Sequence, residues 1–514
     1  MIIQGTGRSA AVSDRSDVVV VGTGSGGGTL AAYLAERGWD VVLVEKGGFF
    51  RAEEFSQREE DAMADFNGRR GLDASTDNAV FLNYAEAVGG STVHYWGDSF
   101  RTPADRLARW RAEHGLEWMT EAELAPHWDA IERELGVHVA GEELFNENNR
   151  LVRAGCAALG FDGHAAPTAR VDCISCGWTQ FGCAYNRKMS QLITTIPRVS
   201  KRGGRVYSDA RAEQILVDAG RVRGVEGVLL DRATKREKSR FRITADRVVL
   251  AGGALGTAEL LLRNLEDATV GRRLYINPHF FVWADFGRTI DNQTGIPCAY
   301  VVHEFREVRR DARGAYAGGG YIMLCNHQSP GIAAVMLNGT GAAHTERMTK
   351  YHRLGSVMSV IDETHPGRVF LDDDGIRRTE FRVRGVDQQK ALDYLRNASR
   401  IFLAAGAQEV WIPDVYGTVV RSETDVRTKI GLRSVQPNVQ FVAGSHLLGT
   451  APLGTDAADS FAGPTGEAHR VRGLYVADGA AVPGSVSVDP SLTIMGLARW
   501  IAAALHERDG RAGA

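Results

Sequence analysis

The feature that most constrains the fold is a glycine-rich turn between two apolar runs near the start of the chain. Gly22, Gly24 and Gly27 directly follow the run Val18 to Val21 and open a helix-forming stretch. An uninterrupted apolar run of this length is typical of a parallel strand that is buried on both faces. Glycines at this spacing allow a tight turn, close approach of the backbone to a diphosphate, and close packing of helix on strand. The pattern therefore predicts a nucleotide-binding strand–helix–strand unit.

An acidic residue closes the second predicted strand of this unit. Glu45 ends the run DVVLVE, 23 positions after Gly22. A carboxylate there can accept hydrogen bonds from ribose hydroxyls, and it repels a 2′-phosphate. The N–H groups and the dipole at the start of the helix favour the negative diphosphate. The unit predicts a dinucleotide other than NADP but does not separate FAD from NAD, and a glycine turn without a ligand is the alternative interpretation.

Composition and charge exclude several classes of protein. The 514 residues, 44% of them hydrophobic, can bury a large core, which suggests two or three domains or one discontinuous pair. The net charge of −3 gives no indication of a nucleic-acid partner. The sequence has no run of about 18 apolar residues and no signal-peptide core, so we expect no membrane span and a cytoplasmic protein. Six cysteines in so long a chain do not form a disulfide framework.

The pattern along the chain predicts a nucleotide-binding domain built from both ends. Residues 247–264 repeat the strand–glycine–helix pattern of the N-terminal unit. A strand-like section with one helix near 387–405 follows. The last section returns to strands, first in VQFVAG, and to a terminal helix that begins at Pro490. The predicted boundaries are 14–277 plus 436–514 for the nucleotide-binding domain, about 52–190 for a lid and helical section within it, and 278–435 for the inserted domain.

Four separated motifs resemble those of the glucose–methanol–choline (GMC) oxidoreductase family, in the family's order. They are AVGGSTVHYWGDSFR (87–101), VVLAGGALGTAELLLRN (248–264), SHLLGTAPLG (445–454) and GLYVADGAAVPGSVSVDPSLTIMGLA (473–498). The resemblance extends from about residue 15 to the C-terminus and implies an α/β (α+β overall) fold. It implies FAD rather than NAD, a Rossmann-like FAD-binding domain, and an inserted antiparallel-sheet substrate-binding domain.

The resemblance assigns further residues to the FAD site. Besides Gly22, Gly24, Gly27 and Glu45, they are Gly90, Ser91, His94, Asp478, Gly479, Pro490, Ser491 and Leu492. Asp478 would bind the diphosphate or ribityl region, with an ordinary turn aspartate as the alternative. Pro490 is expected at the first helical position, where its missing N–H costs nothing, and the helix dipole would stabilise the reduced flavin. His94 contacts the flavin in the family and bonds to it covalently in some members; we favour non-covalent FAD, and simple packing on the flavin is the alternative role.

Two residues match the family's catalytic pair, with one departure. His446, in the motif SHLLGT, matches the active-site histidine, which can take the hydroxyl proton of an alcohol and hold it as imidazolium. The second position, usually Asn or His in the family, is Asp489 here. An anion can accept a hydrogen bond from the substrate hydroxyl and favour the imidazolium, but it cannot donate as Asn would. Asp489 before a helix-opening proline is also a favoured N-cap, and the two roles are compatible.

Three cysteines, Cys173, Cys176 and Cys183, lie close together in the motif CISCGWTQFGC. A closed zinc site needs four ligands, and an iron–sulfur cluster fails the same count. The block resembles a Cys-Gly…Gly-Cys segment of bacterial family members that is structural or lines the site. We therefore predict no metal.

Together the motifs predict an FAD-dependent oxidoreductase, a dehydrogenase or an oxidase, that acts on a CH–OH group. The resemblance implies hydride transfer to flavin N5 with His446 as general base, and the match at His94 favours a sugar, a glycoside or another alcohol; aryl and steroid alcohols stay open. The substrate is expected between the flavin and the inserted sheet, near His94 and Trp96, and the electron acceptor is O2, a quinone or a protein. The alternatives are a non-redox lyase or decarboxylase of the same family and a catalytic subunit that passes electrons to a partner protein.

Overall fold

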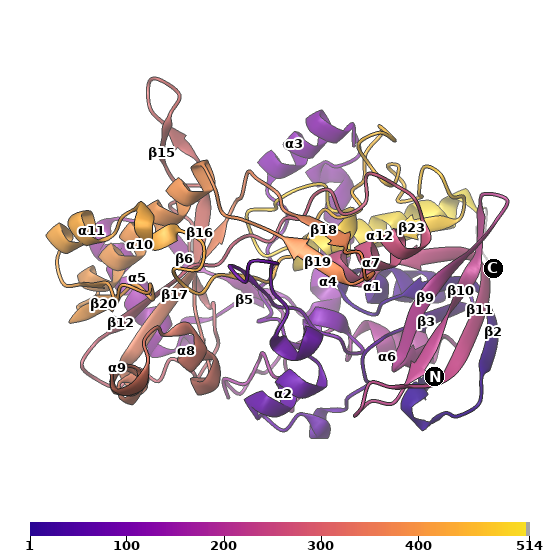
Figure 1. Ribbon diagram of the computed structural model, residues 1–514, viewed down its shortest axis with the longest axis horizontal. Coiled ribbons are helices and arrows are strands. Elements are labelled where there is room, and N and C mark those ends of the chain that lie inside the picture. Colours follow the sequence, from indigo (N-terminus) through magenta and orange to yellow (C-terminus); the bar gives the residue numbers. More distant parts are fainter. Residues whose placement is uncertain (510–514) are drawn as a thin grey trace.

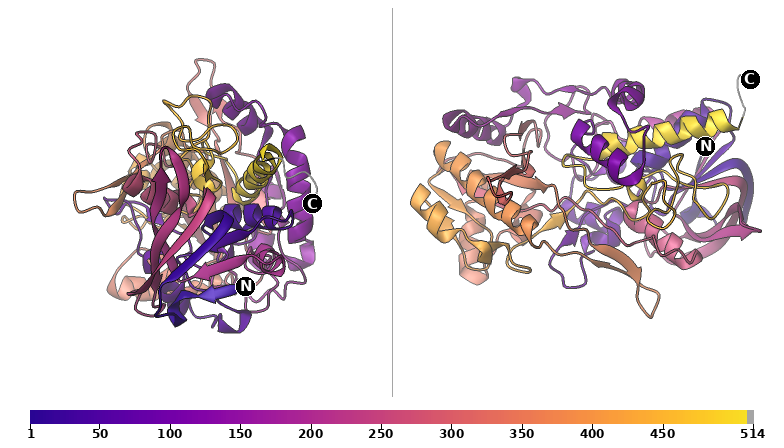
Figure 2. Two further views of the ribbon diagram at one scale, coloured as in Figure 1. Left: turned by 90° about the vertical axis from the view of Figure 1, so that its right-hand side faces the viewer. Right: turned by 90° about the horizontal axis from the view of Figure 1, so that it is seen from above.

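The computed structural model describes residues 1–509 of the chain. Two large sheets form the cores of its two halves, and Figure 1 shows them at opposite ends of the long axis. The N-terminus and the C-terminal helix both lie in the half that contains the first sheet (Figures 1 and 2). The segment between the two ends of the chain builds most of the second half.

The first sheet is mixed, with a parallel core. Its strands, in spatial order, are β1 (Ile2–Gln4), β8 (Arg205–Ser208), β3 (Val41–Val44), β2 (Val12–Val21), β11 (Glu237–Leu250), β10 (Arg221–Leu230) and β9 (Ala210–Asp218), and β23 (Leu474–Val476) also pairs with β11. The pairs from β1 to β11 and the β11–β23 pair are parallel, whereas β10 and β9 add an antiparallel extension. All of β3 and Val18, Val19 and Val20 of β2 are buried, as their apolar runs predict. This sheet confirms the predicted Rossmann-like core.

Helices from both ends of the chain meet beside this sheet. α1 (Ser25–Ala35), which follows the glycine turn, packs against α12 (Ser491–Arg508). α7 (Gly253–Asn264) follows β11 as α1 follows β2. The other helices in contact with this pair are α4 (Glu121–Leu135), which packs on α12, and α6 (Thr195–Lys201), which packs on α1. Figure 2 shows α12 running along the half of the molecule that contains the first sheet.

The second sheet is antiparallel throughout. Its strands, in spatial order, are β21 (Val419–Val420), β20 (Glu409–Trp411), β12 (Phe281–Asp285), β17 (Leu354–Ile361), β16 (Tyr321–Cys325), β13 (Tyr300–Val302) and β6 (Gly163–Ala165). α10 (Val386–Ala404), the helix predicted near 387–405, packs against this sheet and against α5 (Glu147–Leu159). β6 and α5 lie within the range 14–277 predicted for the FAD-binding domain, yet both pack in the second half because β6 pairs with β13.

The remaining elements are short. The other helices are α2 (Glu59–Asp65), α3 (Ala104–His114), α8 (Pro330–Met336), α9 (Gly341–Thr349) and α11 (Glu423–Lys429). The two-stranded sheets pair β14 (Arg309–Arg310) with β15 (Tyr316–Gly318), β18 (Arg368–Leu371) with β19 (Arg377–Glu380), β4 (Phe81–Leu82) with β22 (Ala443–Gly444), and β5 (His138–Val139) with β7 (Pro167–Thr168). The strand predicted for VQFVAG is largely wrong, since only its last two residues form β22. Within residues 1–509, no helix combines the length and the apolar character needed to cross a membrane.

Candidate active site

The three glycines of the first turn are fixed by direct backbone contacts. Gly22 has a φ of +107°, and a Cβ there would overlap the carbonyl oxygen of Ala251, just after β11. A Cβ on Gly27 would overlap the carbonyl oxygen of Gly22, so α1 lies directly against the turn. Gly24 is the N-cap of α1, and the first N–H groups of that helix have no partner within it. The structure therefore brings the three predicted glycines together at a helix N-terminus.

Two further glycines allow other backbone segments to pack closely against the same turn. Gly90 has a φ of +55°, and a Cβ there would lie 2.5 Å from the Cα of Gly24. A Cβ on Gly26 would overlap the carbonyl oxygen of Ala477, at the end of β23. The sequence motifs assign Gly90 to this site, but Gly26 was missed. The available signal was the excess of glycines in GTGSGGG.

Glu45 is buried at the end of β3, where the sequence predicts a ribose acceptor. Its Oε2 accepts from the N–H and the hydroxyl of Thr23, at 3.1 and 2.7 Å, and its Oε1 accepts from the N–H of Gly47 at 2.9 Å. The Thr23 hydroxyl also accepts from the N–H of Gly89 at 2.9 Å. Burial raises the pKa of Glu45, and the hydrogen bonds oppose that rise. Each carboxylate oxygen can accept two hydrogen bonds, so Oε1 retains capacity for a ribose hydroxyl. Thr23 was not singled out from the sequence.

Asp478 is buried after β23 and already has protein partners. Its Oδ2 accepts from the N–H of Gly253 and the hydroxyl of Thr257, both at 2.7 Å. Asp478 therefore caps the start of α7, which fits the interpretation as a structural turn residue. Burial raises the pKa of Asp478 to about 6, and these hydrogen bonds oppose the rise. Its role as a ligand of FAD stays a prediction.

The segment that carries Ser91 and His94 begins with a short 3-10 turn, Gly90–Val93. The Ser91 hydroxyl accepts from the N–H of Ala85 at 3.1 Å. Burial, followed by the charge of Lys188, lowers the pKa of His94 to about 3. His94 is therefore a neutral imidazole, and its contact with a flavin stays a prediction.

The start of α12 differs from the prediction. Pro490 is the N-cap of the helix rather than its first residue, and Asp489 makes no capping bond. The predicted N-cap role of Asp489 is wrong because the proline occupies that position. Ser491, the first helical residue, donates its hydroxyl proton to the carbonyl of Asp98 at 3.0 Å. Leu492 is buried in the core.

His446 and Asp489 come together from segments 43 positions apart. The Nε2 of His446 lies 3.0 Å from the Oδ1 of Asp489, and only 10% and 13% of the two side chains is exposed. The carbonyl of Gly479 accepts from the N–H of Gly449 at 2.9 Å, which joins the motif of Asp478 to that of His446. The Nδ1 of His446 and the Oδ2 of Asp489 are buried and have no hydrogen-bond partner among the described residues. Because buried polar atoms are normally paired, these two atoms indicate a site for a ligand with a hydrogen-bonding group.

A second histidine, His279, lies against this pair. The ring centroids of His279 and His446 are 4.9 Å apart, and the rings are nearly perpendicular at 83°. The Nδ1 of His279 donates to the carbonyl of Ser359 at 2.7 Å, so Nε2, which has no partner among the described residues, presents a lone pair. Burial, followed by the charge of His446, lowers the pKa of His279 to about 3. His279 was missed in the sequence, where its only signal was a histidine after Pro278, outside the recognised motifs.

Asp98 is a second carboxyl group near Asp489, and it too was missed in the sequence. It is buried beside Cys298, whose thiol donates to the carbonyl of Cys325 at 3.2 Å. Burial and then the charge of Asp489 raise the pKa of Asp98 well above its ordinary range, although Arg170 and the thiol act in the opposite direction. Burial therefore favours the protonated form of Asp98 beside Asp489.

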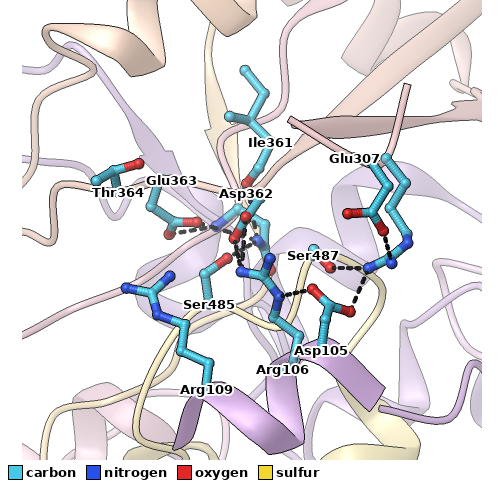
Figure 3. Close-up of polar contacts among 12 residues, drawn as sticks. Asp105, Arg106, Arg109, Glu307, Ile361, Asp362, Glu363, Thr364, Ser485 and Ser487 are labelled. Atoms are coloured by element: carbon cyan, nitrogen blue, oxygen red, sulfur yellow. Dashed lines mark hydrogen bonds and ion pairs between the residues drawn. The ribbon is translucent and has the colours of Figure 1, made fainter. Parts of the chain in front are cut away.

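The segment that leads to Asp489 is held by polar contacts, and Figure 3 shows those at Ser485 and Ser487. Ser487 has a φ of +64°, a conformation that costs a non-glycine residue about 1–2 kcal/mol. The hydroxyl of Ser485 accepts from the Nδ2 of Asn277 at 2.8 Å. The backbone N–H of Asn277 in turn donates to the buried Glu363 at 2.9 Å. These contacts tie the catalytic segment to the end of β17.

Charged pairs reinforce the same junction from α3. Figure 3 shows Asp105 and Arg106 pointing toward the segment of Ser487 and the end of β17. Arg106 donates to both oxygens of Asp362, at 2.8 and 3.0 Å. Arg306 donates to Asp105 at 2.9 Å and lies 3.5 Å from the hydroxyl of Ser487. The position of Asp489 therefore depends on both halves of the molecule.

The cysteine motif forms a separate feature. Cys173, Cys176 and Cys183 line one surface pocket, and all six cysteines of the chain are free thiols. Within residues 1–509, no three His, Cys, Asp or Glu side chains are arranged to hold a metal ion.

The residues of the first turn fit FAD. Gly22, Gly26 and Gly90 let three backbone segments pack directly against the start of α1, where a Cβ would overlap a neighbouring main chain, and such glycine turns are typical of diphosphate-binding sites. The N–H groups of α1 supply donors, and Glu45 supplies the acceptor for a ribose. A dinucleotide cradle next to a buried histidine–carboxylate pair defines the class: a flavin-dependent oxidoreductase.

Comparison with known protein families identifies the family of flavin-dependent oxidoreductases to which the chain belongs. Two models of the GMC oxidoreductase family match residues 1–279 and 364–498. The chain belongs to the GMC oxidoreductase family and is an FAD-dependent enzyme that acts on alcohol groups. The family predicted from the four motifs is thereby confirmed.

Relatives and solved structures agree with this assignment. An uncharacterised GMC-type oxidoreductase of Mycobacterium tuberculosis is 29% identical over 95% of this chain and 75% of its own length. Long-chain-alcohol oxidase FAO4B of Arabidopsis thaliana is 26% identical over 95% of this chain and 67% of its own. Cholesterol oxidase of M. tuberculosis is 23% identical over 93% and 89%. The structure of pyridoxine 4-oxidase from Mesorbium loti has the same fold, with a TM-score of 0.71, 18% identity, and coverage of 96% of this chain and 99% of that one.

Proposed function

We propose that the chain oxidises the CH–OH group of an apolar alcohol, with His446 as general base and Asp489 as the group that orients it. The observation that carries this proposal is the buried His446–Asp489 pair, 3.0 Å apart, whose other polar atoms are unpaired among the described residues. An alcohol hydroxyl can donate a hydrogen bond to one of those atoms. The hydroxyl proton and a buried acceptor then both have a partner.

The pair determines which nitrogen takes the proton. The Oδ1 of Asp489 accepts from the Nε2–H of His446, which leaves the lone pair on Nδ1. Nδ1 then takes the hydroxyl proton as hydride leaves the carbon, and the carboxylate stabilises the imidazolium. His279 does not compete for the proton, because burial and the charge of His446 lower its pKa to about 3. When bound, FAD supplies the two-electron acceptor for the hydride.

The cofactor would be held without a covalent bond. Gly22, Gly24, Gly27 and the N–H groups of α1 would bind the diphosphate, and Glu45 would bind a ribose. By the resemblance of the motifs, the rest of the cofactor would lie near Gly90, Ser91, His94, Asp478, Gly479, Pro490, Ser491 and Leu492. Precipitation with acid tests the absence of a bond, since non-covalent FAD is released into the supernatant and covalent FAD stays with the protein.

The names of the relatives support the substrate class. Long-chain-alcohol oxidases and a cholesterol oxidase align over more than nine-tenths of this chain. They favour a long-chain or sterol alcohol over the sugar or glycoside that the motif at His94 suggests. The same names favour O2 as the electron acceptor over a quinone or a protein. We retain the cytoplasm as the proposed location, which cell fractionation tests.

Anaerobic mixing of the holoenzyme with a panel of alcohols tests the proposal. The panel contains a long-chain primary alcohol, a sterol, an aryl alcohol and a sugar. Bleaching of the flavin absorption band by the first two supports oxidation of an apolar alcohol, whereas bleaching only by the sugar overturns the substrate class. Substrate loss without bleaching would instead favour the lyase or decarboxylase chemistry known in the family. Admission of O2 or a quinone dye to the reduced enzyme then identifies the acceptor.

A further inference from the structure

The pocket at the cysteine motif gathers three thiols among basic side chains. It has a volume of about 340 Å³, part of it open to solvent. Its lining includes Arg170, Cys173, Cys176, Cys183, Tyr185 and Arg187. The other three cysteines of the chain are buried. The pocket therefore holds the thiols that a reagent from solvent can reach.

Cys183 is the thiol whose surroundings favour the negative form. Its Sγ accepts from the backbone N–H groups of Arg187 and Lys188, at 3.2 and 3.4 Å. Burial by itself would raise the pKa of Cys183, but these N–H groups outweigh it and lower that pKa. Burial raises the pKa of Cys156, which lies in the core, to about 12. Since the thiolate is the nucleophilic form of cysteine, Cys183 is the more reactive of these two thiols.

Lys188 connects this thiol to the flavin side of the protein. Its ammonium group is buried and donates to the carbonyls of Val93 and Tyr95, at 2.6 and 2.9 Å, and to that of Thr179. Burial lowers the pKa of Lys188 well below its ordinary range, and the charge of Cys183 opposes that fall. Three carbonyl acceptors match the three N–H bonds of the charged form. A Cys183 thiolate therefore favours the charged form of Lys188, the side chain that holds both neighbours of His94.

Arg170 supplies a donor that has no acceptor. Its side chain lines the pocket and is 4% exposed, and its Nε has no hydrogen-bond partner among the described residues. One terminal nitrogen donates to the carbonyl of Trp96 and the hydroxyl of Thr179, and the other donates to the Sγ of Cys173 at 3.9 Å, which fixes the guanidinium in place. A buried N–H without a partner indicates a site for an oxygen acceptor.

We propose that Cys183 is a nucleophilic site for a hydroperoxide, and that its oxidation alters the segment around His94. The sulfur attacks one peroxide oxygen, so an S–O bond forms and the O–O bond breaks. Sulfur loses two electrons and becomes a sulfenic acid, and the second peroxide oxygen leaves with the electron pair as an alkoxide, or as hydroxide from hydrogen peroxide, and takes a proton from solvent. The N–H groups of Arg170 stabilise the departing oxygen. The neutral sulfenic acid no longer balances the charge of Lys188, which weakens its hold on the carbonyls of Val93 and Tyr95.

Alkylation of the holoenzyme tests the nucleophile directly. The protein is pulsed with iodoacetamide at pH 7, and each cysteine is quantified by peptide mass spectrometry. Cys183 is expected to react at least ten times faster than Cys173 and Cys176, which line the same pocket and serve as internal controls. Equal or slower alkylation of Cys183 would overturn the proposal. This readout does not depend on turnover, so it stands apart from the test of alcohol oxidation.

Treatment with hydrogen peroxide tests the proposed oxidation of Cys183 and its effect on the segment around His94. The holoenzyme receives one equivalent of hydrogen peroxide with dimedone, which traps sulfenic acid, and the flavin spectrum is recorded before and after. The label is expected on Cys183, with a shift of the flavin band in the wild type and in Cys173→Ser but not in Cys183→Ser. Label confined to Cys173 or Cys176, no label at all, or an equal band shift in Cys183→Ser contradicts the proposal.

Discussion

The cofactor side and the catalytic side of the site are built by different physical means. Around Gly22 and Gly90, backbone lies against backbone, and an added Cβ would overlap a neighbouring main chain. Around His446, Asp489 and His279, side chains from distant segments meet, and burial and charge set their chemistry. The first region should therefore respond to added volume and the second to a change of charge at constant volume.

The largest effect is expected from Gly22→Ala. The new Cβ would overlap the carbonyl of Ala251, and the φ of +107° disfavours any side chain. We expect a loss of more than about 3 kcal/mol of stability and little bound FAD, measured by thermal unfolding and by the flavin-to-protein absorbance ratio. Gly38→Ala is the matched control, because Gly38 has a φ of +81° but no atom within 4 Å of an added Cβ. Equal FAD content in the two variants would show that the backbone contact is not required.

His446→Gln comes next, and it acts on chemistry rather than on volume. Glutamine keeps a polar side chain but has no basic nitrogen, so turnover should fall about 10²- to 10⁴-fold. FAD content and thermal stability should stay near those of the wild type. The control is His365→Gln, since His365 pairs with Asp387 at 2.9 Å, and neither residue belongs to the catalytic cluster. A loss of turnover below tenfold in His446→Gln would remove this histidine as the base.

The sequence predicts the cofactor side better than the catalytic side, and the reason is physical. Gly22, Gly24, Gly27 and Glu45 belong to one short strand–helix–strand unit, so their spacing carries the signal even though Gly22 contacts the distant Ala251. His279 and Asp98 gain their roles only from burial beside His446 and Asp489, which no local pattern contains. The start of α12 was misplaced by one position for a related reason. A proline is tolerated at both the N-cap and the first helical position, and tertiary contacts decide between them.

Glu363 lies behind the catalytic segment, and its titration should make the stability of the folded protein depend on pH. Burial raises the pKa of Glu363 to about 7 from 4.5, although the N–H groups of Asn277 and Ile276 oppose the rise. The folded protein therefore holds the proton more tightly than the unfolded chain. The contribution of Glu363 to stability falls as the pH rises from about 4.5 to 7 and is constant above that.

Glu363→Gln should remove this slope. The total change over the window is on the order of 3 kcal/mol, from 1.4 kcal/mol per pKa unit. Urea unfolding at pH 5 and pH 7 measures it, and the stability of the Glu363→Gln variant relative to the wild type should become more favourable at the higher pH. Glu143→Gln, at an exposed position, is the control and should leave the slope unchanged. A wild-type slope retained in Glu363→Gln contradicts the assignment.

The smallest expected effect is also the sharpest test, because one substitution can be made at two neighbouring acids. Asp489→Asn keeps an oxygen that accepts from His446 but removes the negative charge that stabilises the imidazolium. We expect a loss of about tenfold in kcat/KM, or about 1.4 kcal/mol, and a shift of the acidic limb of the pH–rate profile to lower pH. Asp98→Asn should change neither quantity by more than about twofold, because burial and the charge of Asp489 raise the pKa of Asp98 and so favour its uncharged form. If Asp489→Asn leaves both turnover and pH profile unchanged, the carboxylate only positions the segment; if the two variants lose activity equally, volume rather than charge governs the catalytic side.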